Sequence, residues 1–416
     1  MFPVLPTSDM STHRQKTPKI VHLTSVHAPF DVRIFHKECK SIGRAGYDVT
    51  LLAAHDRDET VDGIHLRPIF RPAIRLARIL CAPWSIYRES LRQEADLFHF
   101  HDPELIPVGL LLRLAGKRVV YDAHEDVSAD IAFKHYIPRL LRYPLARVVG
   151  AFERASVRHF SAVVAATPAI SRRFLSRHPR CIVVRNYPSP DGVQLAAKPW
   201  ETRSSSAVYT GLLSPDRSIR QLVDAVALLP ENIQATLHLA GPFSPPTYQR
   251  TVAESEGWKR VNFLGTIPPS SVAHLLNDAR VGLCVYRPDP NSLEAVPNKI
   301  FEYMQAALPV IASDFPGFRE IVKGASCGLL VNPCDRQEIA HAIAYILSHP
   351  QEAEQMGLRG REAVRACFSW TTEERKLLQL YDELLSSCSP AAAETEPIET
   401  PPSTDRLLEI KSYDPQ

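Results

Sequence analysis

Two carboxylates, Glu294 and Glu302, stand eight positions apart on either side of a proline and a lysine. Pro297 suits the first turn of a helix, where its missing N–H costs nothing. We therefore expect Glu294 in the loop before a helix and Glu302 in its second turn. The free N–H groups at such a helix start form an anion site that suits phosphate. Residues 308–312 follow as a short buried strand, so this stretch predicts half of a nucleotide-binding α/β unit.

The same stretch resembles the donor-site motif of family 4 glycosyltransferases, which have the GT-B fold. That motif is a glutamate, seven residues and a second glutamate, then a helix with small residues and a Pro-Val-Ile strand. The positions that match it are Glu294, Pro297, Lys299, Phe301, Glu302, Tyr303, Met304, Pro309, Ser313 and Asp314. The alternative is an ordinary amphipathic helix with two solvated acids, because glutamates at this spacing are common by chance.

The resemblance also implies roles for these residues. Glu302 would hold the ribose hydroxyls of a nucleotide sugar. Glu294, as a catalytic residue, would grip the sugar hydroxyls and orient the anomeric carbon. Asn298 and Lys299 are further donor-binding candidates, with Lys299 stabilising the leaving diphosphate.

Length and composition describe a globular protein of two ordinary domains. The chain has 416 residues, of which 45% are apolar and 23% charged. Residues 16–190 contain 27 Lys and Arg against 17 Asp and Glu, a balance of +10, whereas residues 191–416 contain 20 against 28, a balance of −8. The basic first half indicates an anionic partner, such as a phospholipid surface or a lipid-linked phosphate. Nucleic acid fits the sign, but no recognition motif for it is present.

The eight cysteines and the hydropathy pattern indicate a cytoplasmic protein. No pair of cysteines forms a C-x-x-C motif or a zinc-ligand spacing, so we expect reduced thiols. No signal peptide is apparent in residues 1–19. No apolar run approaches 18 residues, so any membrane association should be peripheral.

Domain boundaries follow from composition and element order. We expect a disordered tail over 1–18, a first domain over 19–187, a second over 188–385 and a disordered tail over 386–416. Prolines at Asn186 to Pro190 mark the linker. The last helix, from about Trp370, should cross back to the first domain, as the resemblance implies.

The first domain opens with a strand over residues 19–24, a loop, a helix over 32–45 and a second strand over 48–53, which is the doubly wound pattern. Many relatives carry a Gly-Gly loop after the first strand, but here residues 25–33 contain no glycine. Bare backbone therefore cannot approach a ligand in the usual way. The side chains that could replace it on the acceptor side are His27, Asp31 and Arg33, unless they only cap the helix.

Polar residues end two successive strands of the first domain. His101-Asp102 follows one strand, and His124 follows the next. Since ligands bind just past the carboxyl ends of parallel strands, we expect both groups on the floor of one cleft. By resemblance, His124 matches the active-site histidine that contacts the donor sugar, and His101 and Asp102 match a polar pair on the acceptor side. The alternative for His124 is a buried, hydrogen-bonded histidine.

Two basic stretches in the first half contain apolar and aromatic residues. They span residues 71–92 and 133–159. Arginines interleaved with apolar side chains are typical of interfacial amphipathic segments. Packed helices with a solvated basic face are the alternative.

The start of the second domain departs from the family pattern. Relatives carry Gly-Arg and then Lys-Gly, whose cations neutralise the donor diphosphate. This chain has Gly211-Leu212 and Arg217-Ser218, so the first cation is missing and the second is arginine. Arginine can still bind phosphate through two hydrogen bonds. Thr266 and Ile267 match where relatives hold the nucleotide base.

The resemblance implies an α/β protein of the GT-B type, with two Rossmann-like doubly wound domains facing each other across a cleft. The reaction that it implies is retaining transfer from a nucleotide sugar, UDP- or GDP-linked, to a glycan or lipid-linked acceptor in surface polysaccharide synthesis. We expect no cofactor and no obligatory metal, and a cytoplasmic location with peripheral contact to the inner face of the plasma membrane. A sugar-nucleotide epimerase and a non-catalytic assembly scaffold remain alternatives. An NAD oxidoreductase is unlikely, because no G-x-G-x-x-G follows a strand.

Overall fold

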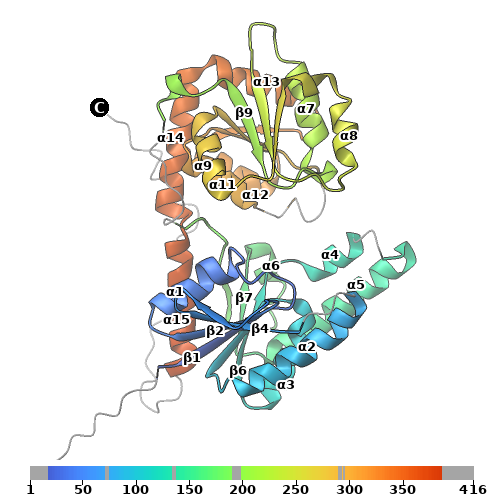
Figure 1. Cartoon of the computed structure of the whole chain (residues 1–416), viewed down its shortest axis with the longest axis vertical. Coiled ribbons are helices and arrows are strands. Elements are labelled where there is room, and N and C mark those ends of the chain that lie inside the picture. The colour runs from blue at the N-terminus through green and yellow to red at the C-terminus, as the bar shows by residue number, and fades with distance from the viewer. Residues whose placement is uncertain are drawn as a thin grey trace, which may run out of the picture.

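Two α/β lobes stand one above the other in the computed structural model (Figure 1). Helices α14 (Pro350–Cys367) and α15 (Trp370–Ser386) run along one side of both lobes. The residues that the structure describes are 17–70, 75–133, 137–189, 198–288, 293 and 296–386.

The lower lobe contains an eight-stranded sheet in the order β3-β4-β2-β1-β5-β6-β7-β8. All neighbours are parallel except the β3–β4 pair. The strands are β1 (Lys19–Leu23), β2 (Asp48–Ala53), β3 (Glu59–Val61), β4 (Ile64–Pro68), β5 (Leu97–Phe100), β6 (Arg118–Ala123), β7 (Ala162–Ala165) and β8 (Cys181–Val183).

The upper lobe contains a six-stranded parallel sheet in the order β11-β10-β9-β12-β13-β14. Its strands are β9 (Ser206–Thr210), β10 (Thr236–Ala240), β11 (Val261–Gly265), β12 (Val281–Cys284), β13 (Val310–Ser313) and β14 (Gly328–Val331).

The remaining helices connect and cover these strands. The α-helices are α1 (Lys40–Arg44), α2 (Arg75–Arg92), α3 (Ile106–Leu114), α4 (Val127–Phe133), α5 (Arg139–Ser156), α6 (Pro168–Arg172), α7 (Ile219–Ala227), α8 (Tyr248–Ala253), α9 (Pro269–Asp278), α11 (Asn298–Gln305), α12 (Pro316–Val322) and α13 (Arg336–Ser348). The other helical turns are Ile34–Cys39, Pro103–Leu105, Val157–His159, Trp200–Thr202, Pro215–Arg217 and Glu256–Arg260.

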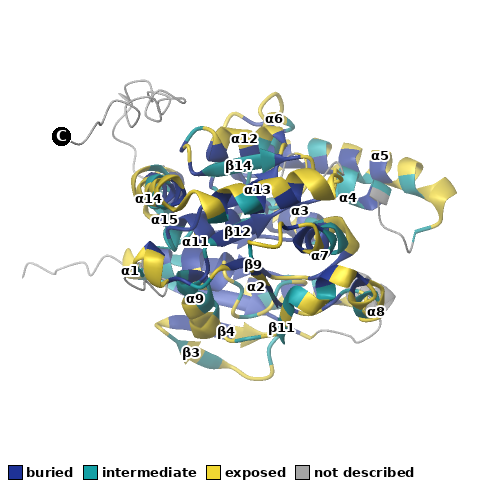
Figure 2. Cartoon of the chain, turned by 90° about the horizontal axis from the view of Figure 1, so that it is seen from above, coloured by how far each residue is buried: buried dark blue, intermediate teal, exposed yellow. Residues whose placement is uncertain are grey.

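The central strands are buried on both faces. Every residue of β5, β7, β12 and β13 is buried, and Figure 2 shows β12 in dark blue between partly exposed helices. Parallel sheets covered by helices on both faces carry continuous apolar runs, which is why these strands show no alternation of polar and apolar residues.

The strand order reverses beside β1 in the first sheet and beside β9 in the second. β1 lies between β2 and β5, and β9 lies between β10 and β12. In doubly wound sheets, ligands bind at such switch points, beyond the carboxyl ends of the strands. The segments that follow β1 and β9 both contribute residues to the space between the lobes.

Helix α15 belongs to the core of the first lobe, although it follows the second lobe in sequence. Trp370, Leu377 and Tyr381 pack into the same apolar cluster as the first sheet. The indole N–H of Trp370 donates to the Ser41 hydroxyl at 2.9 Å, and its backbone N–H donates to the Pro188 carbonyl at 2.9 Å. The chain therefore crosses between the lobes near residues 186–188 and again near 369–370.

The segment after β1 differs from the predicted continuous α-helix. A π-helical turn over Ile34–Cys39 precedes the short helix α1. The Asp31 carboxylate accepts hydrogen bonds from the backbone N–H groups of Arg33 and Ile34 at 2.8 and 2.9 Å, which starts the turn. The wider π-turn places Arg33, Lys37 and Glu38 in the interior.

Two expectations about the chain as a whole concern thiols and membrane spans. The seven cysteines within the described ranges are free. In the same ranges, no helix is both long enough and apolar enough to cross a bilayer.

Candidate functional site

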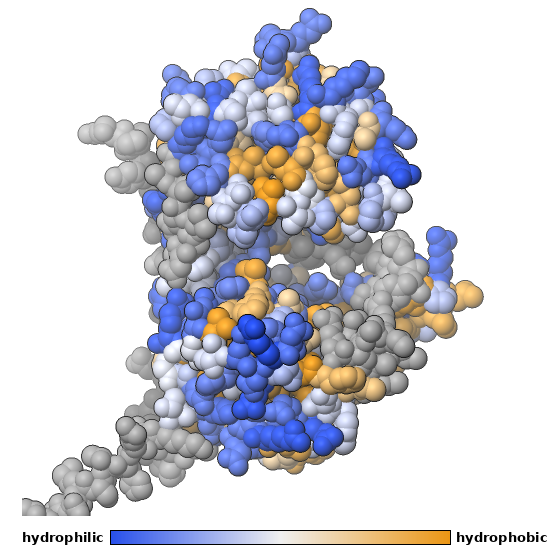
Figure 3. Space-filling view, in the orientation of Figure 1, coloured by the Kyte–Doolittle hydropathy of each residue, from blue (hydrophilic) through white to orange (hydrophobic). Residues whose placement is uncertain are grey.

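A cleft of about 850 Å³ lies between the lobes and appears as a hollow in Figure 3. Both lobes and both crossing segments line it. Among the residues that line it are His36, Lys37, Pro188, Ser189, Gly211, Ile267, Asn298, Lys299, Glu302, Arg361, Arg365 and Ser369.

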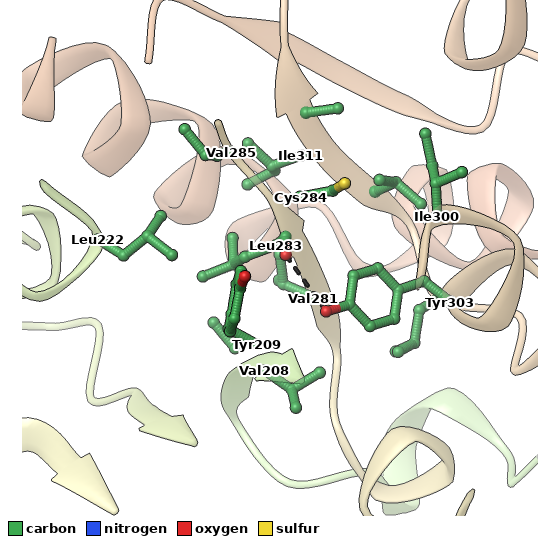
Figure 4. Close-up of a cluster of buried hydrophobic side chains, with 14 of the residues drawn as sticks. Val208, Tyr209, Leu222, Val281, Leu283, Cys284, Val285, Ile300, Tyr303 and Ile311 are labelled. Carbon is green, nitrogen blue, oxygen red and sulfur yellow. Dashed lines mark hydrogen bonds between the residues drawn. The ribbon is translucent and has the colours of Figure 1, made fainter. Parts of the chain in front are cut away.

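Tyr303 fixes helix α11 to the second sheet. The side chain is fully buried, and its hydroxyl donates to the Leu283 carbonyl at 3.2 Å (Figure 4). The hydroxyl oxygen of Tyr303 also accepts a hydrogen bond from the backbone N–H of Thr210 at 3.1 Å. A Cβ at Gly282 would lie 2.6 Å from the Tyr303 ring, so only glycine leaves room for it. Buried contacts therefore set the position of the cleft-facing side of α11.

Lys299 presents its ammonium group at the wall of the cleft. The nitrogen lies 3.7 Å from the ring centroid of Tyr209 and 5.3 Å from that of Tyr286, as in a cation–π contact. Burial lowers the pKa of Lys299 to about 7. Gly211, with φ of 110°, lies so close that a Cβ there would be 3.3 Å from the nitrogen. The backbone turn after β9 and this cation thus converge on one point.

Glu302 follows three residues later on the same helix and lines the same cleft. Its side chain is accessible to water within the cleft, but the surrounding protein raises its pKa by desolvation, which Lys299 and Lys37 oppose. An ionised carboxylate accepts hydrogen bonds through two oxygens, which suits a pair of neighbouring hydroxyls. Asn298 lies at the start of this helix, directly after Pro297, the residue that precedes the first turn.

Arg217 also lies close to the ring of Tyr286. Its guanidinium is 4.0 Å from the ring centroid of Tyr286 and 3.2 Å from the Asp216 carboxylate. Leu212 is 46% exposed and brings no charge to this wall. On the second-lobe side, Lys299, Arg361 and Arg365 therefore line the cleft, and Arg217 lies beside Tyr286 outside that lining.

The remaining candidates of the second lobe are Ile267, Thr266 and Glu294. Ile267 lines the cleft, and Thr266 beside it is exposed. Glu294 lies outside the described residues, so its catalytic role stays a prediction.

Arg33 is buried behind the cleft wall and does not face a ligand. Its guanidinium donates to Asp122 at 3.0–3.1 Å and to the Val184 carbonyl at 2.8 Å, and lies 2.9 Å from Glu38. The acceptor-side role expected from the sequence is therefore not what the geometry supports. The Asp31 cap and the π-turn direct this side chain toward the sheet, where it neutralises buried acid.

His101 and His124, expected on one cleft floor, meet at Asp122. The Asp122 carboxylate lies 3.0 Å from His124 Nε2 and 3.3 Å from His101 Nδ1. Burial opposes ionisation of Asp122, but Arg33 and His124 hold its pKa well below the usual range. Burial lowers the pKa of His101 to about 4. The hydrogen-bond network thus assigns N–H to both facing nitrogens, and His101 is neutral.

The same hydrogen-bond network continues inward to helix α15. His101 Nε2 lies 2.9 Å from His22 Nδ1, and His22 Nε2 lies 3.3 Å from the Tyr381 hydroxyl, which also contacts His99 Nδ1 at 2.5 Å. Burial lowers the pKa of His22 and of His99, so both are neutral. Asp122 thereby fixes the tautomer of each histidine in turn. Through Tyr381, the same hydrogen bonds join α15 to His22 on β1 and His99 on β5.

His27, Asp31 and His124 are the first-lobe candidates that stay partly exposed. His27 lies between two carboxylates, 3.5 Å from Asp31 and 3.4 Å from Asp102, and its ring centroid is 5.1 Å from that of His124. Burial opposes protonation of His27, but Asp31 and Asp102 raise its pKa. Asp102 is buried and accepts from the Thr24 hydroxyl at 2.8 Å. On the first lobe, His27 and His124 are therefore partly exposed to solvent. The buried residues Asp102 and His101 lie against them.

Two groups of described residues bring metal-ligand atoms together: His22, Glu38, His99 and His101, and His101, Asp122 and His124. In the first group, the rings of His22 and His101 are 21° from parallel, with centroids 5.1 Å apart and nitrogens 2.9 Å apart. The two nitrogens therefore point at each other and form a hydrogen bond. A zinc ion between them would need about 2.1 Å to each nitrogen. In the second group, the Arg33 guanidinium already occupies the Asp122 carboxylate.

Comparison with known proteins identifies the family of the chain. The model of glycosyltransferase family 4 matches residues 32–186, and the model of glycosyl transferases group 1 matches residues 194–363. Together they cover most of the chain. The protein belongs to the group 1, or family 4, glycosyltransferases.

The curated relatives of this glycosyltransferase match only part of it. The alpha-maltose-1-phosphate synthase of Mycolicibacterium smegmatis is 25% identical over 255 residues, which cover 55% of this chain and 65% of that protein. The D-rhamnosyltransferase WbpZ of Pseudomonas aeruginosa is 25% identical over 294 residues, 68% of this chain and 72% of that one. Over the first of these relatives, the match thus spans less than two thirds of the relative's length.

Solved structures confirm the predicted GT-B fold of this glycosyltransferase. The sucrose-phosphate synthase of Thermosynechococcus elongatus has a TM-score of 0.73 at 21% identity, covering 89% of this chain and all of that one. Anabaena Alr3699/HepE, solved in complex with UDP and glucose, has a TM-score of 0.68 at 17% identity, covering 88% of this chain and all of that one.

The sequence analysis missed four residues that shape the site of this glycosyltransferase. Lys37 lines the cleft, Asp122 and Glu38 form its buried acid pair, and Tyr381 closes the hydrogen-bond network. Asp122 carried a usable signal, because it lies two residues before His124 and thus on the same side of an extended chain. Tyr381 carried none, because its partners lie more than 280 positions away.

Proposed function

We propose that this protein transfers a sugar from a nucleotide diphosphate sugar to a glycan or lipid-linked acceptor, with retention at the anomeric carbon. The observation that carries the proposal is the placement of Lys299 and Glu302 on one side of α11, at the wall of a cleft between two doubly wound sheets. A cation and an acceptor-only carboxylate on the same side of one helix suit the phosphate and the ribose hydroxyls of one nucleotide.

Stabilisation of the leaving diphosphate is the main chemical contribution that the cleft offers. In an oxocarbenium-like transition state, negative charge grows on the diphosphate, and cations and helix starts fixed in advance stabilise it. Lys299, Arg217 and the first turn of α11 supply positive charge at that place. We propose that these groups carry the charge without an obligatory metal and without a further cofactor.

The positions that we propose for the other parts of the substrate follow from the placement of Lys299 and Glu302. The nucleotide base would lie against Ile267 and Thr266, with the ribose on Glu302. The transferred sugar would lie between Glu294 and His124. The acceptor would approach from the side of His27, where the carboxylates of Asp31 and Asp102 orient the ring.

The sugar, the base and the acceptor are proposed as classes. The complex of HepE with UDP and glucose supports a UDP sugar, and GDP sugars remain in the same class. The name of WbpZ, a D-rhamnosyltransferase, supports sugar transfer, and we propose surface polysaccharide synthesis as its setting. We place the protein in the cytoplasm, where nucleotide sugars are available.

Titration calorimetry with a panel of UDP-, GDP- and ADP-sugars tests the proposal. One donor should bind, and Glu302→Gln should weaken it about ten- to a hundredfold by removing a charge-assisted contact. Glu338→Gln, an exposed acid on α13, is the matched control and should leave binding unchanged. Equal affinity in the wild type and Glu302→Gln would contradict the donor assignment.

Helix α5 supports docking on an anionic membrane. Its buried side packs against α4, with Gly150 in contact with Ser128. Its outer side exposes apolar residues where a surface helix is normally polar: Leu140 is 90% exposed, Tyr143 68% and Val148 66%. Figure 3 shows orange side chains at the projecting end of this helix.

Arginines accompany these apolar residues. Arg139 and Arg147 on the same helix are exposed, and the first half of the chain has the basic balance of +10. Apolar side chains flanked by cations suit the interface of an anionic bilayer, where each basic residue contributes about 1 kcal/mol. We therefore propose reversible docking of α5 on the inner face of the plasma membrane.

Co-sedimentation with liposomes tests the docking. The wild type should bind vesicles that contain anionic lipid at low salt and dissociate as salt increases. Leu140→Gln combined with Val148→Gln should abolish binding, whereas Leu175→Gln, a 55% exposed leucine elsewhere in the same lobe, should not. Wild-type binding by the double variant would refute a role for α5, and a soluble acceptor would then be the better proposal.

A further inference from the structure

Lys37 is a buried cation at the wall of the cleft, on the side opposite Lys299. It lies on the π-helical turn after β1, is 5% exposed and lines the cleft. Its ammonium donates to the Asn186 side-chain oxygen at 2.5 Å and to the Asn186 carbonyl at 3.2 Å. It also lies 5.9 Å from the Trp370 ring centroid. Both contacts are on segments where the chain crosses between the lobes.

The surroundings of Lys37 do not neutralise its charge directly. Among the described residues, its hydrogen bonds use two of three N–H groups, and both go to neutral oxygens. The titratable groups that act on it are Arg33, Asp31 and Glu38 from its own segment and Glu302 from α11. The linker and α15 contribute the uncharged Asn186 and Trp370. A buried charge without a bonded counter-ion is costly, so an anion in the cleft would be stabilised there.

Two positions that could bring a cation to the donor site do not do so. Leu212 stands where relatives carry arginine, and Arg33 is held by Asp122, Glu38 and a carbonyl. The loop after β1 offers no glycine backbone. Lys37 is thus the cation that the first lobe turns toward the cleft from the segment after that loop.

We propose that Lys37 binds the diphosphate of the nucleotide sugar from the first lobe, opposite Lys299. The inference rests on the proposed function, because it assumes a nucleotide diphosphate in this cleft. The ammonium keeps its two bonds to Asn186 and gives its third N–H to a phosphate oxygen. Since Asn186 and Trp370 lie at the crossings, the diphosphate then bridges the lobes close to their hinge.

Calorimetric titration of UDP at pH 8, in two buffers of different ionisation enthalpy, tests the proposal in the full chain. Burial and Arg33 lower the pKa of Lys37 to about 8, so it is about half charged before UDP binds. A phosphate contact completes that charge by taking up a proton. Lys37→Met should weaken UDP binding about ten- to a hundredfold and reduce the proton uptake by about half a proton per UDP.

Two further variants separate the phosphate contact from a structural role. Lys37→Arg keeps a cation whose pKa is far above 8, so it should retain most of the affinity and still lose the half proton of uptake. Lys40→Met removes a lysine three residues later that pairs with Asp62 outside the cleft, and should behave as the wild type.

The outcomes distinguish this inference from the function on which it rests. If Lys37→Met keeps the wild-type affinity and proton uptake, or loses affinity with unchanged uptake, Lys37 only supports the hinge and the inference is wrong. If the wild type binds neither UDP nor GDP, the proposed donor class fails. If Lys37→Met does not fold, Lys37→Arg provides the test instead. Proton uptake by Lys37→Arg equal to that of the wild type would also overturn the inference.

Discussion

Arg33 lies between two buried carboxylates, Asp122 and Glu38, and needs only one of them as a counter-ion. The pKa of Asp122 is held well below its usual range, and burial together with Asp122 raises the pKa of Glu38 well above its own. At neutral pH, Asp122 is therefore ionised and Glu38 is neutral. We predict that Asp122→Asn and Glu38→Gln will be strongly non-additive in the free energy of unfolding.

The magnitudes follow from which charge each variant removes. Glu38→Gln replaces one neutral group by another and should cost about 1 kcal/mol or less. Asp122→Asn removes the counter-ion, but Glu38 lies 2.9 Å from Arg33 and can ionise in its place, so we expect about 1–2 kcal/mol. The double variant leaves a buried guanidinium without any carboxylate, which should cost about 3–5 kcal/mol. The coupling between the two sites should then be about 1–3 kcal/mol.

The pH dependence of Glu38→Gln gives a second test with a definite sign. Because the folded pKa of Glu38 is raised, its proton contributes stability that is complete below the unfolded pKa of about 4.3 and is lost as pH rises toward the folded value. Glutamine does not titrate. The variant should therefore gain stability relative to the wild type between about pH 5 and pH 8.

Urea unfolding followed by circular dichroism measures both effects. Glu125→Gln, an exposed acid in the same lobe, is the control and should leave the unfolding free energy unchanged. Additivity of the two substitutions within about 0.5 kcal/mol would refute the shared counter-ion. A loss of stability of Glu38→Gln relative to the wild type as pH rises would refute the neutral state of Glu38.

Three further predictions concern the cleft. Glu294→Gln should lower kcat at nearly unchanged donor affinity, whereas Glu302→Gln should weaken donor binding about ten- to a hundredfold; steady-state kinetics and titration should separate the two, and identical behaviour would contradict their roles. Transfer should continue in excess EDTA, and complete loss that Mg²⁺ or Mn²⁺ restores would contradict the proposed charge stabilisers. Because the pKa of Lys299 is about 7, its loss of a proton should lower nucleotide affinity from pH 7 to pH 9, by at most about tenfold per pH unit for this amine; Lys299→Arg should remove this part of the dependence and leave the part that Lys37 contributes.

Local patterns predicted part of the second-lobe side of the cleft, whereas Arg217 and Thr266 are not among its lining residues. The spacing of Pro297, Lys299 and Glu302 fixed which residues share a helix start, and the structure places Lys299 and Glu302 on the same wall. The strand ends at His101 and His124 were also placed together correctly, because parallel strands present their carboxyl ends at one edge.

Long-range packing explains what the sequence did not reveal. The direction of Arg33 depends on a π-turn and on Asp122, which is 89 positions away. The tautomers of the histidine network depend on that same carboxylate and on Tyr381 from α15. Lys37 became a cleft residue only because the linker and Trp370 meet beside it. None of these contacts has a periodic signal in the chain.

Proton NMR of the first sugar product tests the central claim most directly. The protein is incubated with the donor that binds most tightly, with and without a glycan acceptor, and the anomeric proton is followed from the start of the reaction. The account predicts release of the nucleoside diphosphate together with a product of the same anomeric configuration as the donor. An inverted product, or conversion of the nucleotide sugar into its epimer without loss of the nucleotide, would contradict it.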